Sequence, residues 1–349
     1  MARLRRVDIA GPGISRKRRG RGFAYLDENG ERIGDIETLE RIRELAIPPA
    51  WIDVWICPYP NGHIQAVGTD AAGRKQYRYH QKWRERRDQI KFDKMIEFAR
   101  ALPELRKTAA ADVGAKGVPR ERVLACAVRL LDRGFFRIGG EEYAEENESF
   151  GLATMRRSHV MLEEDYTLTF DYPSKSGKRR VRSVVDPEVY EVVAALKTRR
   201  SGPRDLLVYK ADGTWFDVKS DDINSYIKEV TGGDFSAKDF RTWSGTVVAA
   251  LALAVSGEVA KSKAGRKRAI TRAIGEVAHH LGNTPAVARA SYIDPRVFDR
   301  YLGGVTIGGV LPELGDVGEL GQPAFQGRVE EAVLDLLEEE PSPALEKVA

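Results

Sequence analysis

The chain has 349 residues, 42% hydrophobic and 31% charged, which is typical of a globular protein with one large core or two modest domains. No apolar run reaches the roughly 18 residues of a membrane-spanning helix, and the basic N-terminus lacks the apolar stretch of a secretory signal. The two cysteines, Cys57 and Cys126, are far apart and outside any CxxC pair, which argues against a zinc ribbon or a disulfide scaffold and favours a cytoplasmic protein.

The net charge of +4 is unevenly distributed along the chain. Residues 1–22 contain eight Arg or Lys against one acidic residue, whereas residues 312–349 contain ten acidic residues against two basic ones. We expect the first segment to be a flexible basic arm and the second to be an acidic tail with a helix over roughly 326–340. A basic body with an acidic end suggests a polyanionic partner, but two solvated charged ends would give the same pattern.

Residues 23–95 are predicted to form a small β-rich domain. Residues 51–56 alternate in polarity and are rich in β-forming side chains, residues 58–62 have a turn composition, and residues 63–68 are predicted to be the returning strand. A basic helix is expected from 79 to about 101, and Pro103 and the stretch 114–119 are expected to interrupt the chain beyond it.

Residues 96–311 are predicted to form a larger, mainly helical domain. Apolar side chains recur at helical spacing over 121–136, and residues 166–170 and 180–185 predict a β-hairpin with its turn at 173–177. Almost everything beyond 186 is predicted to be helical, with helices near 187–199, 221–230, 242–255, 266–281 and 285–291. The expected fold class is therefore α+β.

Four cationic or aromatic motifs suggest chemistry on a phosphodiester. They are FFRIG with Arg137, SKSGK with Lys175, KDFRT with Arg241 and ASYIDP with Tyr292. Each is weak alone, because such arginines and lysines are usually solvated and such tyrosines often belong to a core. Arg241 opens a predicted helix, where a positive charge opposes the helix dipole, and this cost suggests an anionic partner.

Together the four residues could cut a nucleic-acid backbone without a metal. Two arginines can form bidentate bonds to a phosphate, Lys175 can protonate the leaving oxygen, and Tyr292 can attack phosphorus. A tyrosine hydroxyl, whose pKa is ordinarily about 10, is a poor nucleophile at neutral pH and would depend on the surrounding cations. The adjacent His279 and His280 point in different directions on a helix and have no partner ligand at metal spacing. With no GxxxxGK[ST] loop for ATP, we expect neither metal nor cofactor.

From about 23 to about 302 the chain closely resembles the poxvirus-like type IB DNA topoisomerases of bacteria. Besides the motifs above, the resemblance rests on AIPPAW (46–51), GRKQYRYH (73–80) and LGNTP (281–285). It implies that Tyr292 bonds covalently to the 3′-phosphate of one strand and that Arg137 and Arg241 stabilise the transition state. It also implies that Lys175 protonates the 5′-oxygen, with Arg137 assisting or Lys178 sharing the role.

Asn283 departs from the wider pattern of the relatives. Nine residues before the tyrosine, the poxvirus and eukaryotic enzymes carry histidine. Asparagine can donate a neutral hydrogen bond to a phosphate oxygen but cannot carry the proton or the charge. His279 and His280 are out of register for that role.

The resemblance also predicts contacts to duplex DNA. The segment with Arg74, Gln76, Tyr77 and Tyr79 resembles the family's major-groove strand, since glutamine can read adenine edges and tyrosine can pack on bases. Tyr143 matches a DNA-contacting tyrosine of the relatives. Without the resemblance, the segment would be an ordinary exposed strand and Tyr143 a solvent-exposed loop residue.

The activity that the resemblance implies is relaxation of positive and negative supercoils by cleavage, strand rotation and religation, without ATP or metal. A monomer acting on double-stranded DNA at the nucleoid would close as a C-shaped clamp, with a catalytic domain of the tyrosine recombinase and topoisomerase IB type. Two alternatives are a tyrosine site-specific recombinase and a non-catalytic DNA-binding protein. A tyrosine recombinase usually carries histidine three residues before the second arginine, where this chain has Lys238, and this difference favours the topoisomerase. A non-catalytic DNA-binding protein would need no such set of arginine, lysine and tyrosine, so the presence of the set argues against it.

Overall fold

The computed structural model describes residues 3–256, 262–315 and 326–347. The chain divides into two compact units, Met1–Asp93 and Lys94–Ala349. The division falls within the long helix α2 (Gln81–Val113).

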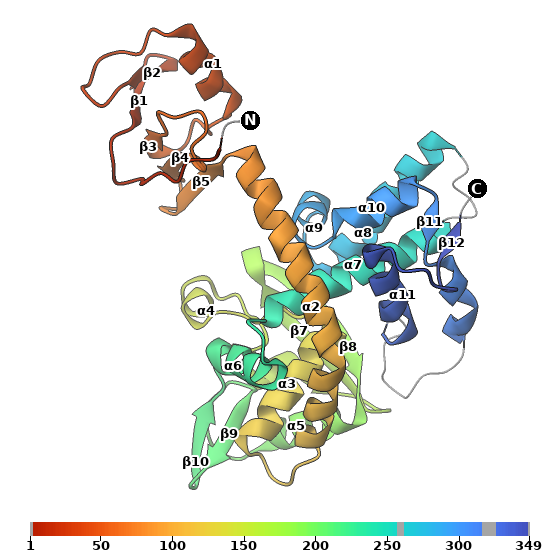
Figure 1. The fold of residues 1–349 in the computed structure, drawn as a ribbon. Helices are drawn as coiled ribbons and strands as arrows, with labels where there is room; N and C mark the ends of the chain where they lie inside the picture. The colour runs from red at the N-terminus through yellow and green to blue at the C-terminus, as the bar shows by residue number, and fades with distance from the viewer. Residues whose placement is uncertain (1–2, 257–261, 316–325, 348–349) are drawn as a thin grey trace. The chain divides into compact units, whose positions relative to one another are not determined.

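The first unit, in the red and orange part of Figure 1, is a five-stranded antiparallel sheet with one short helix. Its strand order is β2-β1-β3-β4-β5, and α1 (Ile36–Glu44) packs on it through Ile42, which joins Ile14, Val54, Ile56 and Ala66 in a small core. The strands are β1 (Ile14–Arg19), β2 (Gly22–Leu26), β3 (Ile52–Ile56), β4 (Ile64–Thr69) and β5 (Lys75–Tyr79). The hairpin predicted over 51–68 is confirmed as β3 and β4.

The expectation of a flexible arm through residue 22 is wrong from Ile14 onward, because β1 lies within the sheet. Strand β1 pairs with β2 and β3, and Arg16 attaches it further, because its guanidinium donates to the carbonyl oxygens of Ile47, Pro48 and Trp51 at 3.4, 3.1 and 2.6 Å. The same group lies 4.1 Å from the centre of the Phe23 ring. One basic residue of the segment therefore satisfies carbonyl oxygens before β3 and adds to the strand pairing that holds β1.

Helix α2 continues through Pro103, where the sequence predicted an interruption. A proline inside a helix removes one backbone hydrogen bond and crowds the preceding turn, at a cost of about 3 kcal/mol. Phe98, Leu102 and Leu105, on either side of it, are fully or almost fully buried. Burying three large apolar side chains offsets that cost.

Within its described residues, the second unit combines the C-terminal part of α2, nine further α-helices, a three-stranded sheet and two small two-stranded sheets. The helices after α2 are α3 (Arg120–Gly134), α4 (Glu141–Asn147), α5 (Pro187–Thr198), α6 (Ser220–Thr231), α7 (Ala237–Ser256), α8 (Lys263–Leu281), α9 (Pro285–Ser291), α10 (Pro295–Leu302) and α11 (Arg328–Glu338). In Figure 1, α8, α10 and α11 pack around α7.

The larger sheet of this unit has the order β6-β7-β8 and contains the predicted hairpin. Its strands are β6 (Val160–Leu162), β7 (Thr167–Ser174) and β8 (Lys178–Val185), and the turn between the last two is the short helical segment η2 (Lys175–Gly177). Two further short helical segments are η1 (Arg157–His159) and η4 (Gly308–Gly315).

A second hairpin, β9 (Val208–Ala211) and β10 (Thr214–Asp217), interrupts the region that was predicted to be almost entirely helical. Its turn is Asp212-Gly213, and both residues have positive φ, at 48° and 80°. Asp-Gly between β-forming residues is a strong hairpin signal, so this element was readable from the sequence.

Residues 326–338 of the acidic C-terminal segment pack within the second unit. Glu330 of α11 is buried and accepts hydrogen bonds from Trp243 Nε1 at 2.7 Å and from both terminal nitrogens of Arg106 at 2.6 and 2.9 Å. Arg106 also donates to both carboxylate oxygens of Asp132 on α3, at 2.9 Å each, and Gln326 donates to Asp132. Beyond α11, β12 (Glu346–Lys347) pairs with β11 (Val305–Thr306).

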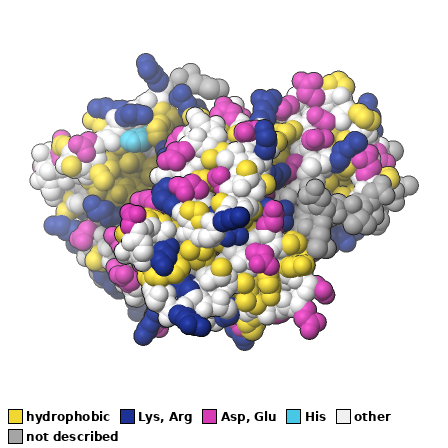
Figure 2. All heavy atoms as spheres, turned by 90° about the horizontal axis from the view of Figure 1, so that it is seen from below, with side chains coloured by type: hydrophobic (Ala, Val, Ile, Leu, Met, Phe, Trp, Pro, Cys, Tyr) yellow, Lys and Arg dark blue, Asp and Glu magenta, His cyan; other side chains and the backbone are white. Residues whose placement is uncertain are grey.

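On the face drawn in Figure 2, Lys and Arg side chains are interspersed with Asp and Glu. The uneven charge along the sequence therefore produces no single-signed surface on that side. Among the helices that the structure describes, none is both long enough and apolar enough to cross a membrane.

Replacing Glu330 with alanine should destabilise the protein. The change leaves Trp243 Nε1 without its acceptor and takes one of two carboxylates from Arg106, and breaking a buried ion pair costs about 3–5 kcal/mol. Urea unfolding of Glu330→Ala should show a clearly lower midpoint than the wild type. The exposed neighbour Glu331 gives the control, because Glu331→Ala should leave the midpoint within error. Equal midpoints for both variants would contradict a packed acidic segment.

Candidate active site

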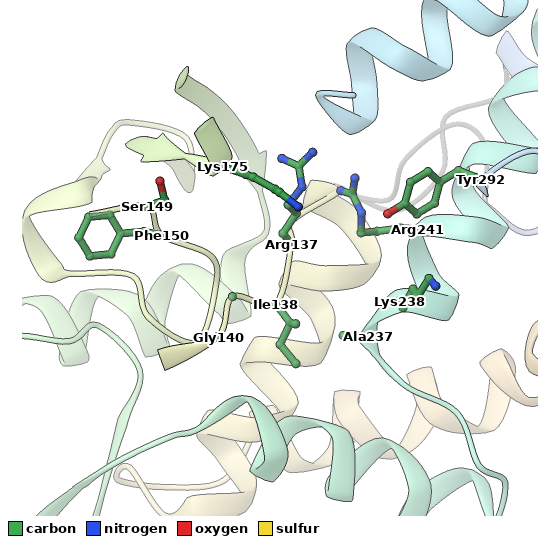
Figure 3. A pocket seen from close by; sticks show the side chains of 11 residues that line it. Arg137, Ile138, Gly140, Ser149, Phe150, Lys175, Ala237, Lys238, Arg241 and Tyr292 are labelled. Carbon is green, nitrogen blue, oxygen red and sulfur yellow. The ribbon is translucent and has the colours of Figure 1, made fainter. Parts of the chain in front are cut away.

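Four of the five predicted catalytic side chains line one pocket of the second unit, and the fifth, Asn283, is outside the lining but bonded to Arg137. Arg137, Lys175, Arg241 and Tyr292 line a cavity of about 370 Å³. Figure 3 shows Lys175 extending toward Arg137, and the Tyr292 hydroxyl directed toward Arg241. The other lining residues are Ile138, Gly139, Gly140, Ser149, Phe150, Ala237 and Lys238.

Arg241 is a buried cation, with only 4% of its surface exposed. Its terminal nitrogens donate to the carbonyl oxygens of Phe135 and Leu281, at 2.8 and 2.9 Å. Burial lowers the pKa of Arg241 to about 10, an effect that Tyr292 opposes and Arg137 reinforces. Its Nε is buried with no hydrogen-bond partner among the described residues, so one donor is available to a ligand in the pocket.

The expectation that Arg241 opens a helix is wrong, because α7 begins at Ala237. Arg241 therefore lies in the second turn, while the first turn holds the acidic Asp239. Its guanidinium is directed instead at the C-terminal end of α8 and lies 5.1 Å from the centre of the Tyr292 ring.

Arg137 enters the pocket from the loop that follows α3. Phe135, directly after the last residue of α3, turns the chain with a φ of 55°. Gly139 (φ 85°) passes so close to Gly151 that a Cβ at Gly139 would lie 2.9 Å from the Gly151 Cα. Arg137 donates to the Gly282 carbonyl oxygen at 2.8 Å and to Asn283 Oδ1. A longer contact of 3.3 Å joins it to the Ser174 hydroxyl.

Asn283 is oriented by this contact. Because its side-chain oxygen accepts from Arg137, its amide nitrogen is the end left to donate. That nitrogen is buried and has no hydrogen-bond partner in the described chain. Its expected role as a neutral donor to a phosphate oxygen stays a prediction.

Tyr292 ends α9, and its backbone N–H donates to the Ala288 carbonyl oxygen at 3.0 Å. Two residues later the buried carboxylate of Asp294 caps α10 and pairs with Arg296. The Asp294 N–H donates to Thr246 on α7 at 3.1 Å. The half-buried Tyr292 therefore lies between α9, which packs on α8, and α10, which packs on α7.

Lys175 is the exposed first residue of the turn between β7 and β8, directly after the buried Ser174. The pocket lining includes Lys175 but not Lys178, the first residue of β8. Lys238, three residues before Arg241, lines the same pocket.

Four arginines converge on the last turn of α8 and the glycine that ends it. The consecutive carbonyl oxygens of His279, His280, Leu281 and Gly282 accept from Arg182, Arg180, Arg241 and Arg137. The end of a helix leaves such carbonyls without intrahelical donors and carries partial negative charge, which favours cations. Gly282 closes the helix with a φ of 61°.

Sequence reasoning missed Arg180 and Arg182. The alternation of β8 was the available signal, because it places these two residues on one side of the strand and Val181 and Ser183 on the other. Their contact with α8 needed the fold.

The predicted DNA-contact residues of the first unit lie on and just before β5. Tyr77 and Tyr79 are exposed and stacked, with ring centres 5.9 Å apart. The Asp70 carboxylate in the preceding turn accepts from the backbone N–H of Arg74 and from the side chains of Arg74 and Gln76. The backbone bond from Arg74 is the largest of the effects that lower the pKa of Asp70 to about 2, and the two side chains add to it. Tyr143 belongs to α4 in the second unit, and its side chain lies outside the described residues.

The described residues contain no cluster of three or more His, Cys, Asp or Glu side chains that could hold a metal ion. His279 and His280 of α8 instead contribute their backbone oxygens to the arginines.

Two family models match the chain. The one described as "Eukaryotic DNA topoisomerase I, catalytic core" matches residues 80–301, and "Bacterial DNA topoisomerase IB, N-terminal domain" matches residues 22–70. Among curated proteins, DNA topoisomerase 1B of Acanthamoeba polyphaga mimivirus is 31% identical over 296 residues, which are 83% of this chain and 87% of the relative.

Eukaryotic relatives match a shorter region. DNA topoisomerase 1 beta of Arabidopsis thaliana is 26% identical over 167 residues, 48% of this chain and 17% of the relative. DNA topoisomerase 1 of Schizosaccharomyces pombe is 27% identical over 158 residues, 45% of this chain and 18% of the relative. The matched region is thus a small part of these two longer proteins.

The approach of Tyr292 to α7 predicts that Gly245 cannot be enlarged. A Cβ at Gly245 would lie 2.5 Å from the Tyr292 carbonyl oxygen, so Gly245→Ala should cost about 1–3 kcal/mol and lower the melting temperature. Gly275 in α8 is the matched control, because a Cβ there meets nothing within 4 Å. Gly275→Ala should stabilise its helix by up to about 1 kcal/mol. Calorimetry that shows both variants shifting alike would contradict this packing.

Proposed function

Because the chain belongs to the type IB DNA topoisomerases, we propose that it relaxes supercoiled DNA by cutting one strand through Tyr292. The observation that supports these roles is the single pocket that joins Tyr292 to Arg137, Arg241 and Lys175. Phosphoryl transfer needs an in-line nucleophile, charge neutralisation on the non-bridging oxygens and a proton for the leaving oxygen.

In the proposed cleavage step, the Tyr292 oxygen attacks a backbone phosphorus and releases its own proton to solvent. The bond from phosphorus to the 5′-oxygen breaks, and a 3′-phosphotyrosyl bond forms in its place. Lys175 gives its proton to the leaving 5′-oxygen, with Arg137 assisting. The Nε of Arg241 and the amide nitrogen of Asn283, both buried donors lacking a partner in the described chain, bind the non-bridging oxygens.

The charge of the site supports an anionic ligand. In the described structure, the hydrogen-bond acceptors of Arg137 and Arg241 are neutral carbonyl, amide and hydroxyl oxygens. Their positive charges therefore have no carboxylate to balance them. A phosphodiester would provide that balance in the place where negative charge grows during the reaction.

Strand rotation and religation complete the proposed reaction. The phosphotyrosyl bond conserves the energy of the cut bond, so the free 5′-hydroxyl can attack it and reseal the strand without ATP. Torque drives the rotation, so supercoils of either sign relax. The chemistry of the proposed groups requires no metal.

We further propose that the protein acts as a monomer on DNA in the bacterial nucleoid and closes around the duplex as a clamp. Tyr77 and Tyr79 provide an exposed aromatic face for DNA, and basic side chains give affinity that falls with salt. Arg74 and Gln76 would contact DNA from a turn that Asp70 already orders.

The decisive substitution removes the proposed nucleophile. Negatively or positively supercoiled plasmid, incubated in EDTA without ATP, should be relaxed by the wild type, and Tyr292→Phe should reduce the rate below detection while still binding DNA. Tyr301→Phe is the control, because the buried Tyr301 hydroxyl has no partner among the described residues, and its loss should leave relaxation unchanged.

Two results would contradict the assignment. Relaxation by Tyr292→Phe would remove Tyr292 from the chemistry. If wild type and variant both bound plasmid and neither relaxed it, a tyrosine recombinase or a non-catalytic DNA-binding protein would be the better account.

A further inference from the structure

Besides Arg137 and Arg241, two arginines of β8, Arg180 and Arg182, donate to the end of α8. Arg180 Nη2 donates to the His280 carbonyl oxygen at 2.5 Å, and Arg182 Nη2 donates to the His279 carbonyl oxygen at 3.1 Å and also to that of His280. Both side chains are half-buried. They tie β8 to the end of α8, which is also where Arg137 and Arg241 bind.

The guanidinium of Arg180 lies very close to the backbone of Gly282. A Cβ at Gly282 would lie 1.6 Å from Arg180 Nη1, so the guanidinium rests directly against the backbone of Gly282. The carbonyl oxygen of the same glycine accepts from Arg137. The position of Arg180 is therefore set by the same residue that positions Arg137.

The hairpin links Arg180 to Lys175 over a short distance along the chain. In the β7–β8 register Arg180 pairs with Tyr172, and the last pair before the turn is Ser174 with Lys178. Lys175 begins the turn that this last pair closes. Holding Arg180 against α8 therefore holds the base of the turn that carries Lys175, and the 3.3 Å contact from Arg137 to Ser174 is its second attachment.

The charged form of Arg180 is disfavoured by its surroundings at the end of α8. Burial lowers its pKa to about 10, and the neighbouring Arg182, Arg241 and Arg137 contribute to that decrease while Tyr172 opposes them. The hydrogen-bond acceptor that the structure gives Arg180 is a neutral carbonyl oxygen. A cation retained against desolvation and like-charge repulsion is typical of functional sites.

We propose that Arg180 is a positioning residue for proton transfer. Through the His280 carbonyl oxygen it fixes the β7–β8 turn so that Lys175 reaches the leaving 5′-oxygen. This inference rests on the proposed function, because it needs a strand-cleavage step in which Lys175 is the proton donor.

Changing the leaving group of the DNA substrate tests whether Arg180 positions the proton donor or has another role in cleavage. In a duplex whose scissile 5′-oxygen is replaced by sulfur, the leaving group is a thiolate, which is far less basic than an alkoxide and needs no proton donor. A variant that is defective only in proton transfer should cleave the sulfur substrate as the wild type does. A variant that is defective in transition-state stabilisation or in folding should be slow on both.

The experiment is single-turnover cleavage of matched oxygen and sulfur duplexes. Arg180→Ala should cleave the oxygen substrate on the order of 10–100-fold more slowly, as expected for a small misplacement of a catalytic group, and the sulfur substrate at the wild-type rate. Lys175→Ala should show the same pattern with a larger defect, and Arg241→Ala should be slow on both. Arg180→Gln, which keeps an N–H donor, gives a second variant if Arg180→Ala is unstable.

Arg179→Ala is the matched control. Arg179 is the exposed neighbour in β8 and pairs with Asp171 across the hairpin, so the variant loses the same charge without touching α8. It should cleave both substrates at the wild-type rate.

The outcomes distinguish this inference from the function on which it rests. Slow cleavage of both substrates by Arg180→Ala and Arg180→Gln, or wild-type cleavage of both, would overturn the positioning role and leave the proposed function intact. Failure of sulfur to rescue Lys175→Ala would overturn Lys175 as the acid and the inference with it. A wild type that cleaves neither duplex would contradict the proposed function itself.

Discussion

The end of α8 is the anchor on which the site depends. Four consecutive carbonyl oxygens, from His279 to Gly282, accept from four arginines that belong to three different elements. The bonds serve both partners, because a helix end needs donors and buried guanidinium groups need acceptors. From the same point the chain continues through Asn283 and α9 to Tyr292. The end of α8 therefore positions both the proposed nucleophile and the arginines.

A contrast within the second unit shows why these acceptors matter. Arg106 is balanced by the carboxylates of Asp132 and Glu330, and its role is to join α2, α3 and α11. Arg137 and Arg241 are held just as firmly but by neutral oxygens, so their charge remains available. Electrostatic stabilisation of a transition state requires charged groups that are held in position but whose charge is not neutralised by a counter-ion. The cost is a buried positive cluster that a phosphodiester would balance.

Much of this arrangement could be predicted from residue patterns and from resemblance. The motifs around Arg137, Lys175, Arg241 and Tyr292 are spread over more than 150 residues, yet the structure brings them into one pocket. The features that escaped prediction depended on long-range contacts. Arg16 joins β1 to a turn about thirty residues away through its bonds to Ile47 and Pro48. Arg180 matters only once the end of α8 is known to lie beside β8.

The covalent bond from Tyr292 to the 3′-phosphate of a cut strand is the step on which the rest of the proposed reaction depends. A duplex labelled on one strand, either upstream or downstream of the cut, can be incubated with the protein and denatured, and the labelled peptide identified by mass spectrometry. The proposed function predicts that the upstream fragment is bound through its 3′-phosphate to Tyr292 and that Arg241→Ala forms the same adduct much more slowly. A downstream fragment bound through its 5′-phosphate, or an adduct on another residue, would contradict it.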